Sequence, residues 1–258
     1  MKLHSTISGE GAPLLILHGL YGCSDNWLTI AKELSEDFCI HRLDLRNHGR
    51  SPHSDEHNYT VMAEDIKEYM NDHELKKAII LGHSMGGKVA MLFTLTYPDR
   101  VDKLIVADIA PKNYTINYDG HIKILDVMRS LDLDEVDRRK EIEEQLTSLL
   151  KSEKVVKLVM KNLHRKKDKT FEWRINLPVL YDKLENITGG TEGWDKLQTK
   201  VPALFIKGEN SHYLTLEDDF IIRKSFSNSE LTVIPNAGHW LHAEQPELVI
   251  KTILYFIK

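Results

Sequence analysis

The chain has 258 residues, of which 41% are hydrophobic, and its formal net charge is −5. This length allows one large α/β domain with a sizeable core, or two small ones, and the weakly acidic balance argues against nucleic acid as a partner. Two cysteines, Cys23 and Cys39, are too few for a disulfide framework and fit no zinc spacing. With neither a signal-like N-terminus nor an apolar run of membrane-spanning length, we expect a soluble cytoplasmic protein without stable membrane association.

Apolar runs alternate with amphipathic segments over the first part of the chain. Strands are expected over residues 14–17, 38–43, 78–81 and 101–107. Helices are expected over residues 25–35, from a Thr60 N-cap onward, and after residue 88. Continuous apolar strands separated by amphipathic helices are typical of a parallel sheet covered on both faces.

The pattern changes after Pro111. Residues 114–186 are helical in character, rich in charge and without a convincing strand, and the basic cluster at 165–169 within them is interpreted as solvated surface. Strands return at 203–206 and 231–234, and a helix over 247–257 ends the chain. We therefore predict an α/β core domain formed by residues 1–112 and 187–258, with a helical cap inserted over residues 113–186.

The segment Gly82-His83-Ser84-Met85-Gly86 matches the G-x-S-x-G pattern. It follows the apolar run 78–81 and precedes a helical pattern, which is the strand–turn–helix context of a nucleophile elbow. Glycines are needed there because the serine occupies a strained backbone with little space around it. Ser84 is therefore the predicted nucleophile.

A serine hydroxyl needs a base to remove its proton. Thirteen histidines make a lone histidine uninformative, but His239 follows the last expected strand and a turn containing Gly238. It should therefore lie at the same end of the sheet as Ser84. His242 is the local competitor, and its alternative role is packing or hydrogen bonding beside the site.

The third member should be a carboxylate that orients the imidazole. Asp108 directly follows the strand ending at residue 107, at a strand end where catalytic groups gather. Glu209 follows a later strand and stays open as the alternative acid. The alternative, purely structural interpretation of Asp108 is that it is a helix-cap or turn residue before Pro111.

Two loops complete the predicted site. The loop at residues 18–22 follows the first buried strand, and the backbone N–H groups of Leu20 and Met85 are expected to form an oxyanion hole. The loop at residues 44–51 carries charged and turn residues. We interpret it as an ion-paired structural loop, with a catalytic role for His48 as the alternative.

In the order of these motifs the chain resembles the α/β-hydrolase superfamily, which implies an α/β-hydrolase fold. Within it, several stretches resemble the YbfF-type serine esterases of bacteria and their mitochondrial relatives, namely residues 44–51, 82–88, 161–163 and 171–177. The resemblance implies an esterase for short acyl esters or thioesters, with its acid at Asp108. We expect three side chains in the substrate pocket: Trp173 and Arg174 of the cap, and Trp240. Packing between cap and sheet is the alternative role of the cap aromatics.

Ester hydrolysis through an acyl-enzyme is the leading hypothesis, with a small-molecule ester as substrate and no metal or organic cofactor. Carbon–carbon bond hydrolysis or lyase chemistry on the same fold is the second hypothesis. It would require several arginines near Ser84, and only Arg46 and Arg174 are evident. A non-enzymatic ligand-binding protein is the third, because fold alone does not determine function.

Overall fold

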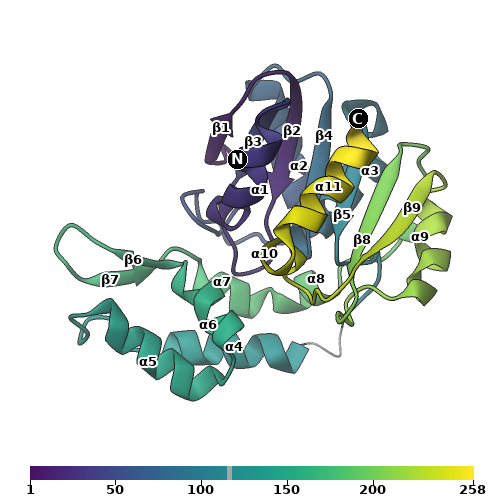
Figure 1. Cartoon of the computed structure of the whole chain (residues 1–258). Coiled ribbons are helices and arrows are strands. Elements are labelled where there is room, and N and C mark those ends of the chain that lie inside the picture. The colour runs from purple at the N-terminus through teal and green to yellow at the C-terminus, as the bar shows by residue number, and fades with distance from the viewer. Residues whose placement is uncertain (115–117) are drawn as a thin grey trace.

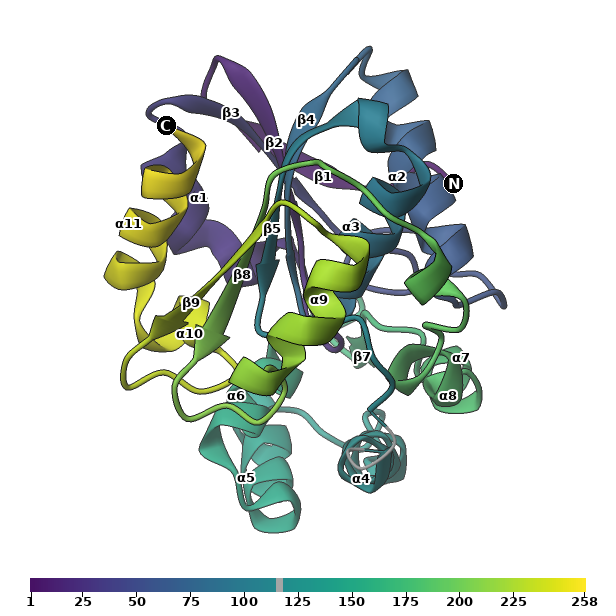
Figure 2. The same ribbon diagram turned by 90° about the vertical axis from the view of Figure 1, so that its right-hand side faces the viewer.

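A computed structural model describes residues 1–114 and 118–258 of the chain. A seven-stranded sheet lies between two layers of helices, with strand order β1-β3-β2-β4-β5-β8-β9 (Figures 1 and 2). Neighbouring strands are parallel, except that β1 is antiparallel to β3. The strands are β1 (Ser5–Ser8), β2 (Ala12–Leu17), β3 (Phe38–Leu43), β4 (Ala78–His83), β5 (Val101–Ala107), β8 (Ala203–Gly208) and β9 (Ser229–Ile234).

Helices cover both faces of this sheet (Figure 2). Helices α1 (Leu28–Leu34) and α11 (Pro246–Ile257) lie on one face, and α2 (Tyr59–Asp72), α3 (Met85–Thr96) and α9 (Asp219–Ser225) lie on the other. Because side chains alternate along a strand, Leu14 and Ile16 of β2 join the apolar cluster under α1 and α11, while Leu15 and Leu17 join the cluster under α2 and α3. The predicted sheet with two covered faces is confirmed.

The segment between β5 and β8 lies beyond the carboxyl ends of the strands (Figure 1). It has its own apolar cluster, which includes Leu125, Leu146, Val159 and Leu180. The division into core and cap stays a prediction, and α8 runs past its proposed limit at residue 186. The elements of this segment are α4 (Tyr118–Ser130), α5 (Arg139–Leu150), α6 (Glu153–Met160), β6 (Leu163–Arg165), β7 (Phe171–Trp173), α7 (Leu177–Asp182) and α8 (Leu184–Thr188).

Two local expectations were wrong, and a third holds for only part of its range. The cap does contain strands, since β6 and β7 form an antiparallel pair, but three residues per strand are too few for alternation to appear in the sequence. Asn58, and not Thr60, caps α2, because its side-chain oxygen accepts a hydrogen bond from the Val61 N–H at 3.0 Å. The helix expected over 25–35 is a 3₁₀ turn, η1 (Ser24–Trp27), followed by α1.

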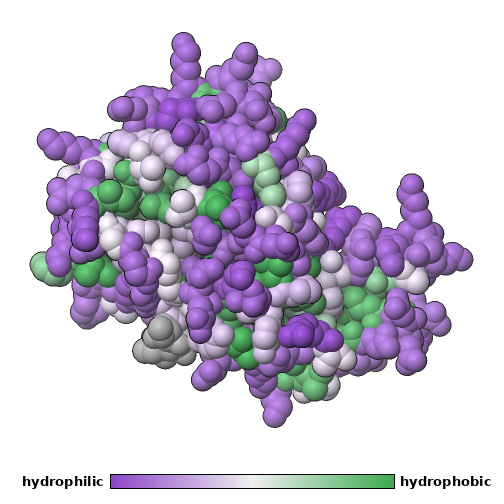
Figure 3. All heavy atoms as spheres, turned by 180° about the vertical axis from the view of Figure 1, so that it is seen from behind, coloured by the Kyte–Doolittle hydropathy of each residue, from purple (hydrophilic) through white to green (hydrophobic). Residues whose placement is uncertain are grey.

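Shorter elements connect these layers. They are α10 (Leu241–Glu244) and the 3₁₀ turns η2 (Pro98–Arg100), η4 (Trp194–Lys196) and η5 (Leu216–Asp218). The rear face is largely hydrophilic, with apolar side chains in separate patches (Figure 3). Among the described residues, every helix is too short or too polar to cross a bilayer.

Candidate active site

Ser84 occupies a strained turn between β4 and α3. Its φ of 52° and ψ of −118° lie outside the regions that L-residues ordinarily adopt. The turn is compact, because a Cβ added to Gly82 would lie 2.2 Å from the carbonyl oxygen of Gly86. The Ser84 N–H is fixed by a 3.1 Å hydrogen bond to the Ala107 carbonyl. The elbow geometry expected from the sequence is therefore present, and the Ser84 side chain faces a cavity.

Asp108 is the carboxylate that meets His239. The Nδ1 atom of His239 lies 2.8 Å from Oδ2 of Asp108, which is completely buried. The Gly208 N–H donates to Oδ1 at 2.9 Å, and the Ser211 hydroxyl donates to Oδ2. Glu209 is exposed instead and accepts a 2.7 Å hydrogen bond from the Asn236 N–H. Of the two acids considered from the sequence, Asp108 is therefore the one whose carboxylate contacts the imidazole of His239.

His239 is held from several sides. The Tyr213 ring stacks on it with 3.8 Å between ring centroids and 20° between planes. The Nε2–H of His83 donates to the backbone carbonyl of His239 at 2.8 Å. Burial, with His239 and His242 nearby, lowers the pKa of His83 well below its usual value, so His83 acts here as a neutral donor. These contacts involve the Nδ1 atom, the ring face and the backbone carbonyl of His239, and none of them uses its second ring nitrogen, Nε2.

His242 lies beside the site in a packing position. Its ring stacks on Trp27 with 4.4 Å between centroids and 12° between planes. Burial lowers the pKa of His242 to about 3, assisted by the charge that His239 and Lys161 can carry. A buried, neutral ring stacked on an indole fits the alternative role considered for this histidine.

Ser84 and His239 line the same cavity, which has a volume of about 460 Å³. The cap contributes one wall of this cavity through His121, Ile124, Leu150, Val155 and Leu158. Leu20, Trp27 and Trp240 line the side nearer the sheet. Apart from Lys123, Asn26 and histidines, the lining is almost entirely apolar or aromatic. The cavity therefore favours an uncharged, partly apolar ligand.

The expected pocket residues separate in the structure. Trp240 lines the cavity, but Trp173 and Arg174 are not among the described residues that do so. The Trp173 indole N–H donates to the Met128 carbonyl at 3.1 Å within the cap, and Arg174 lies 2.7 Å from Nδ1 of His164. Sequence reasoning missed His121 and Tyr213, because neither lies in a motif and their approach to the site depends on how the cap and a loop are placed.

The loop after β2 lies against Ser84. A Cβ added to Gly19 would lie 3.2 Å from that of Ser84 and 2.9 Å from Nδ1 of His83, so the backbone approaches closely. His18 holds the loop, since its Nε2 accepts the Leu45 N–H at 3.0 Å and its Nδ1–H donates to the Gly19 carbonyl at 2.8 Å. Leu20 lines the cavity, and Met85 begins α3 with its side chain buried.

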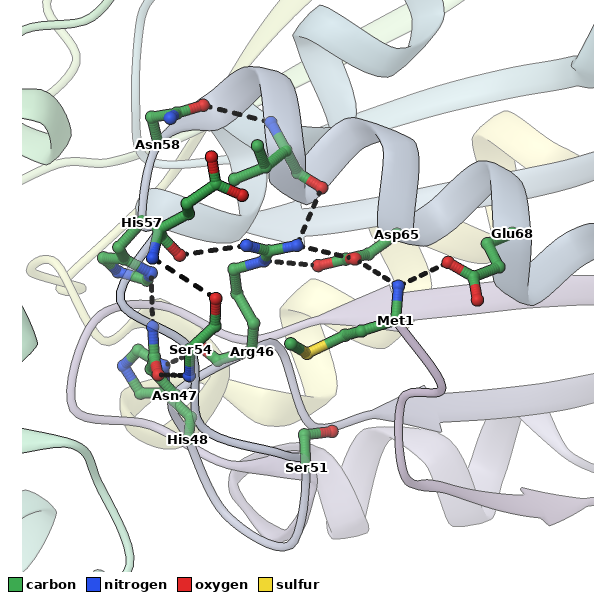
Figure 4. A network of polar contacts seen from close by, with 12 residues as sticks. Met1, Arg46, Asn47, His48, Ser51, Ser54, His57, Asn58, Asp65 and Glu68 are labelled. Carbon is green, nitrogen blue, oxygen red and sulfur yellow. Dashed lines mark hydrogen bonds and ion pairs between the residues drawn. The ribbon is translucent and has the colours of Figure 1, made fainter.

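The loop after β3 forms a separate polar network (Figure 4). Arg46 binds both carboxylate oxygens of Asp65, with Nε at 2.6 Å and Nη2 at 2.8 Å, and both side chains are buried. His48 is fully buried and donates from Nδ1 to the Arg46 carbonyl at 2.9 Å. His48 is not among the described residues that line the cavity. The ion-paired loop predicted from the sequence is present.

Comparison with known proteins agrees with this geometry. A family model described as the alpha/beta hydrolase fold matches residues 12–246. The chain is 38% identical over 257 residues to a putative esterase/lipase of Haemophilus influenzae, covering 99% of this chain and 87% of that protein. It is 35% identical over 251 residues to Esterase YbfF of Escherichia coli, covering 96% and 94%. A solved structure described as a marine microorganism esterase is 45% identical, with a TM-score of 0.95 and 99% of both chains covered. The chain therefore belongs to the alpha/beta hydrolase fold family.

Proposed function

We propose that this protein is a serine esterase that uses Ser84, His239 and Asp108 as a catalytic triad. The observation that carries the proposal is the His239–Asp108 contact of 2.8 Å, beside a cavity that Ser84 also lines. Esterase names among relatives that match nearly the whole chain support the same reaction class. The two free cysteines, Cys23 and Cys39, fit a reducing compartment, and we propose the cytoplasm as its location.

The mechanism follows from the roles available to these groups. His239 Nε2 takes the Ser84 proton as Oγ attacks the ester carbonyl, and Asp108 stabilises the resulting imidazolium. The N–H groups of Leu20 and Met85 stabilise the oxyanion. His239 then gives its proton to the leaving alcohol, which leaves an acyl group on Ser84. Water, deprotonated by His239, releases the acid and restores Ser84.

The cavity favours short acyl chains, in esters or thioesters. Its volume of about 460 Å³ is enclosed on one side by apolar residues of the cap. An acyl chain bound to Ser84 would gain about 0.8 kcal/mol for each methylene it buries against them. Affinity should therefore rise with chain length only until the chain meets the far wall of this confined cavity, so that short chains are favoured over long ones.

The alternatives have less support. Carbon–carbon bond hydrolysis of dicarboxylate-like substrates would need arginines facing Ser84, but Arg46 is bound to Asp65 and Arg174 lies by His164. A binding protein without catalysis would not require His239 and Asp108 to be paired. Neither alternative is favoured by the relatives' names.

The test is hydrolysis of p-nitrophenyl esters from acetate to palmitate by the wild type and by Ser84→Ala. We expect activity greatest on short chains and a loss of about 10⁴-fold or more in kcat for the variant. Ser227→Ala, an exposed serine, is the matched control and should keep full activity. A folded Ser84→Ala protein that hydrolyses these esters at the wild-type rate would refute the proposal.

A further inference from the structure

Lys88 is a buried lysine one helical turn beyond Ser84. Its N–H closes the first turn of α3 onto the Ser84 carbonyl at 3.0 Å, and its side chain is 1% exposed. The ammonium donates to the carbonyl of Gly189 at 2.9 Å and, more weakly, to that of Thr188 at 3.4 Å. Within the described part of the chain no carboxylate forms an ion pair with it. Backbone carbonyls and two tyrosine rings therefore surround a charge that is costly to bury.

Both connections of the cap meet at this lysine. Thr188 and Gly189 lie where the chain leaves α8 and returns to the sheet. Tyr114 lies where the chain leaves the sheet after β5, and its N–H donates to the Thr188 carbonyl at 2.6 Å. The Lys88 ammonium lies 5.1 Å from the centroid of the Tyr114 ring and 5.2 Å from that of Tyr59, whose hydroxyl donates to the Ile187 carbonyl.

We propose that Lys88 is a positioning residue that joins the nucleophile helix to the two connections of the cap and thereby sets the cap wall of the cavity relative to Ser84. The inference rests on the proposed esterase function. Hydrogen bonds from an ammonium to carbonyls are charge-assisted and directional, so they determine where the carbonyls of the cap connection lie. An apolar side chain at this place would fill the same space without determining those positions. The cap wall that Lys88 would position is lined by Ile124, Val155 and Leu158.

Other charged groups near Lys88 do not replace these bonds. The negative charge of Glu192 favours the protonated form of Lys88, but the two side chains form no ion pair. Lys112 lies 5.4 Å from the Tyr114 ring centroid but is paired with Asp218 at 2.7 Å. Burial raises the pKa of Tyr59 and Tyr114, so both rings are neutral and offer only their faces.

The experiment compares Lys88→Met with a matched control, Lys103→Met. Lys103 also donates to two backbone carbonyls, of Phe256 at 2.7 Å and Ile257 at 3.1 Å, and lies over the Phe256 ring, but it is remote from the cap. For each protein, kcat/KM is measured with the p-nitrophenyl esters of hexanoate and acetate. Both substrates place the same ester carbonyl at Ser84, and the hexanoyl chain has four more methylenes than the acetyl group to bury against the apolar residues that line the cavity.

We expect Lys88→Met to lower the hexanoate-to-acetate ratio of kcat/KM by about 10-fold, chiefly through KM, because charge-assisted bonds to the cap are lost. Lys103→Met should keep the wild-type ratio, and Lys88→Arg should restore most of it. Amide hydrogen exchange should be faster by about 10-fold in α4 and α6 of Lys88→Met, but unchanged in β4 and β5.

The exchange measurement does not depend on activity, so it separates this inference from the proposed function. An inactive wild type would refute the esterase and leave the exchange result to decide the role of Lys88. A folded Lys88→Met with wild-type ratio and wild-type cap exchange would overturn the inference. Should Lys88→Met not fold, Lys88→Gln carries the test, because it removes the charge and shortens the side chain but keeps a polar group at this buried position. A wild-type ratio together with wild-type cap exchange in that variant would equally overturn the inference.

Discussion

Two polar clusters lie at the carboxyl edge of the same sheet and differ in what surrounds them. In the first, Ser84 and His239 face a cavity of about 460 Å³, and His239 keeps one ring nitrogen for chemistry. In the second, Arg46 and Asp65 bind each other with both side chains buried (Figure 4). Each cluster contains a buried acidic side chain, Asp108 in the first and Asp65 in the second, so a buried acid alone does not identify a catalytic site.

Access to a cavity and side-chain atoms left free to bond therefore distinguish the proposed catalytic cluster from the structural one. Arg46 uses its guanidinium on Asp65 and on the Glu56 carbonyl, 2.9 Å away, so it has little to offer a ligand. His48 and His57 beside it are buried, and burial lowers the pKa of His57 to about 3. A neutral, enclosed histidine stabilises the loop and does not exchange protons at neutral pH.

The largest expected effect comes from the acid of the reactive cluster. Asp108→Asn should lower kcat by about 10⁴-fold, because a neutral amide neither selects the required imidazole tautomer nor stabilises the imidazolium. Steady-state kinetics with a short p-nitrophenyl ester measure it. Glu209→Gln is the control, and it should change kcat less than about 2-fold because Glu209 is exposed and accepts its hydrogen bond from the Asn236 N–H of a surface turn. The reverse pattern would assign the acid to Glu209.

The structural cluster should respond in stability instead. Asp65→Asn leaves the buried Arg46 charge without its carboxylate, and we expect a loss of about 3–5 kcal/mol in the free energy of unfolding. Urea denaturation measures it, while kcat of the folded fraction should stay near the wild-type value. Asp219→Asn breaks only the exposed pair with Arg223 and should leave the denaturation midpoint unchanged. Equal midpoints for the two variants would contradict the assigned difference.

A smaller effect should reveal strain at the nucleophile. Ser84→Gly and Ser84→Ala both remove the hydroxyl, but only glycine adopts φ 52°, ψ −118° without a Cβ penalty. We expect the glycine variant to be more stable than the alanine variant by about 1 kcal/mol, after allowing for the greater entropy of its unfolded chain. Paired urea denaturation curves give this difference. An alanine variant that is the more stable of the two would argue against strain at Ser84.

The smallest expected effect is a pH dependence of chain-length preference. Burial lowers the pKa of Lys88 from 10.5 to about 7, so its ammonium is progressively lost as pH rises through that value. The hexanoate-to-acetate ratio of kcat/KM should then fall several-fold between about pH 6 and pH 8, because the neutral amine binds the cap carbonyls more weakly. Effects of His239 cancel in the ratio, since both substrates use it. Lys88→Arg should give a ratio independent of pH.

The contribution of Lys88 to folding stability should rise with pH, whereas its effect on chain-length preference should weaken. The unfolded chain holds the extra proton between about pH 7 and 10.5, so the contribution of Lys88 to folding becomes more favourable as pH rises through that window. Compared with Lys88→Met, the wild type should therefore gain stability over this range, which thermal denaturation at several pH values measures. A constant difference between the two proteins would show that Lys88 keeps its proton in the folded state.

The sequence by itself predicted six of the seven strands of the sheet, all except β1, together with the elbow at Ser84 and the histidine loop at His239. These features are local: strand periodicity, glycine spacing and the place of a residue after a strand are all visible in neighbouring residues. The candidates for the triad acid could also be reduced to Asp108 and Glu209, since both follow expected strands whose carboxyl ends lie at the same edge of the sheet.

Only the tertiary structure shows which of those carboxylates contacts His239. Asp108 does so, and that contact joins residues more than a hundred positions apart in the chain. The pocket residues depended on the tertiary structure for the same reason. Trp173 and Arg174 contact other cap residues, Met128 and His164. His121 and Leu158 of the cap line the cavity instead. Helix packing and the meeting of the cap connections at Lys88 arise from long-range contacts, which no local pattern in the sequence encodes.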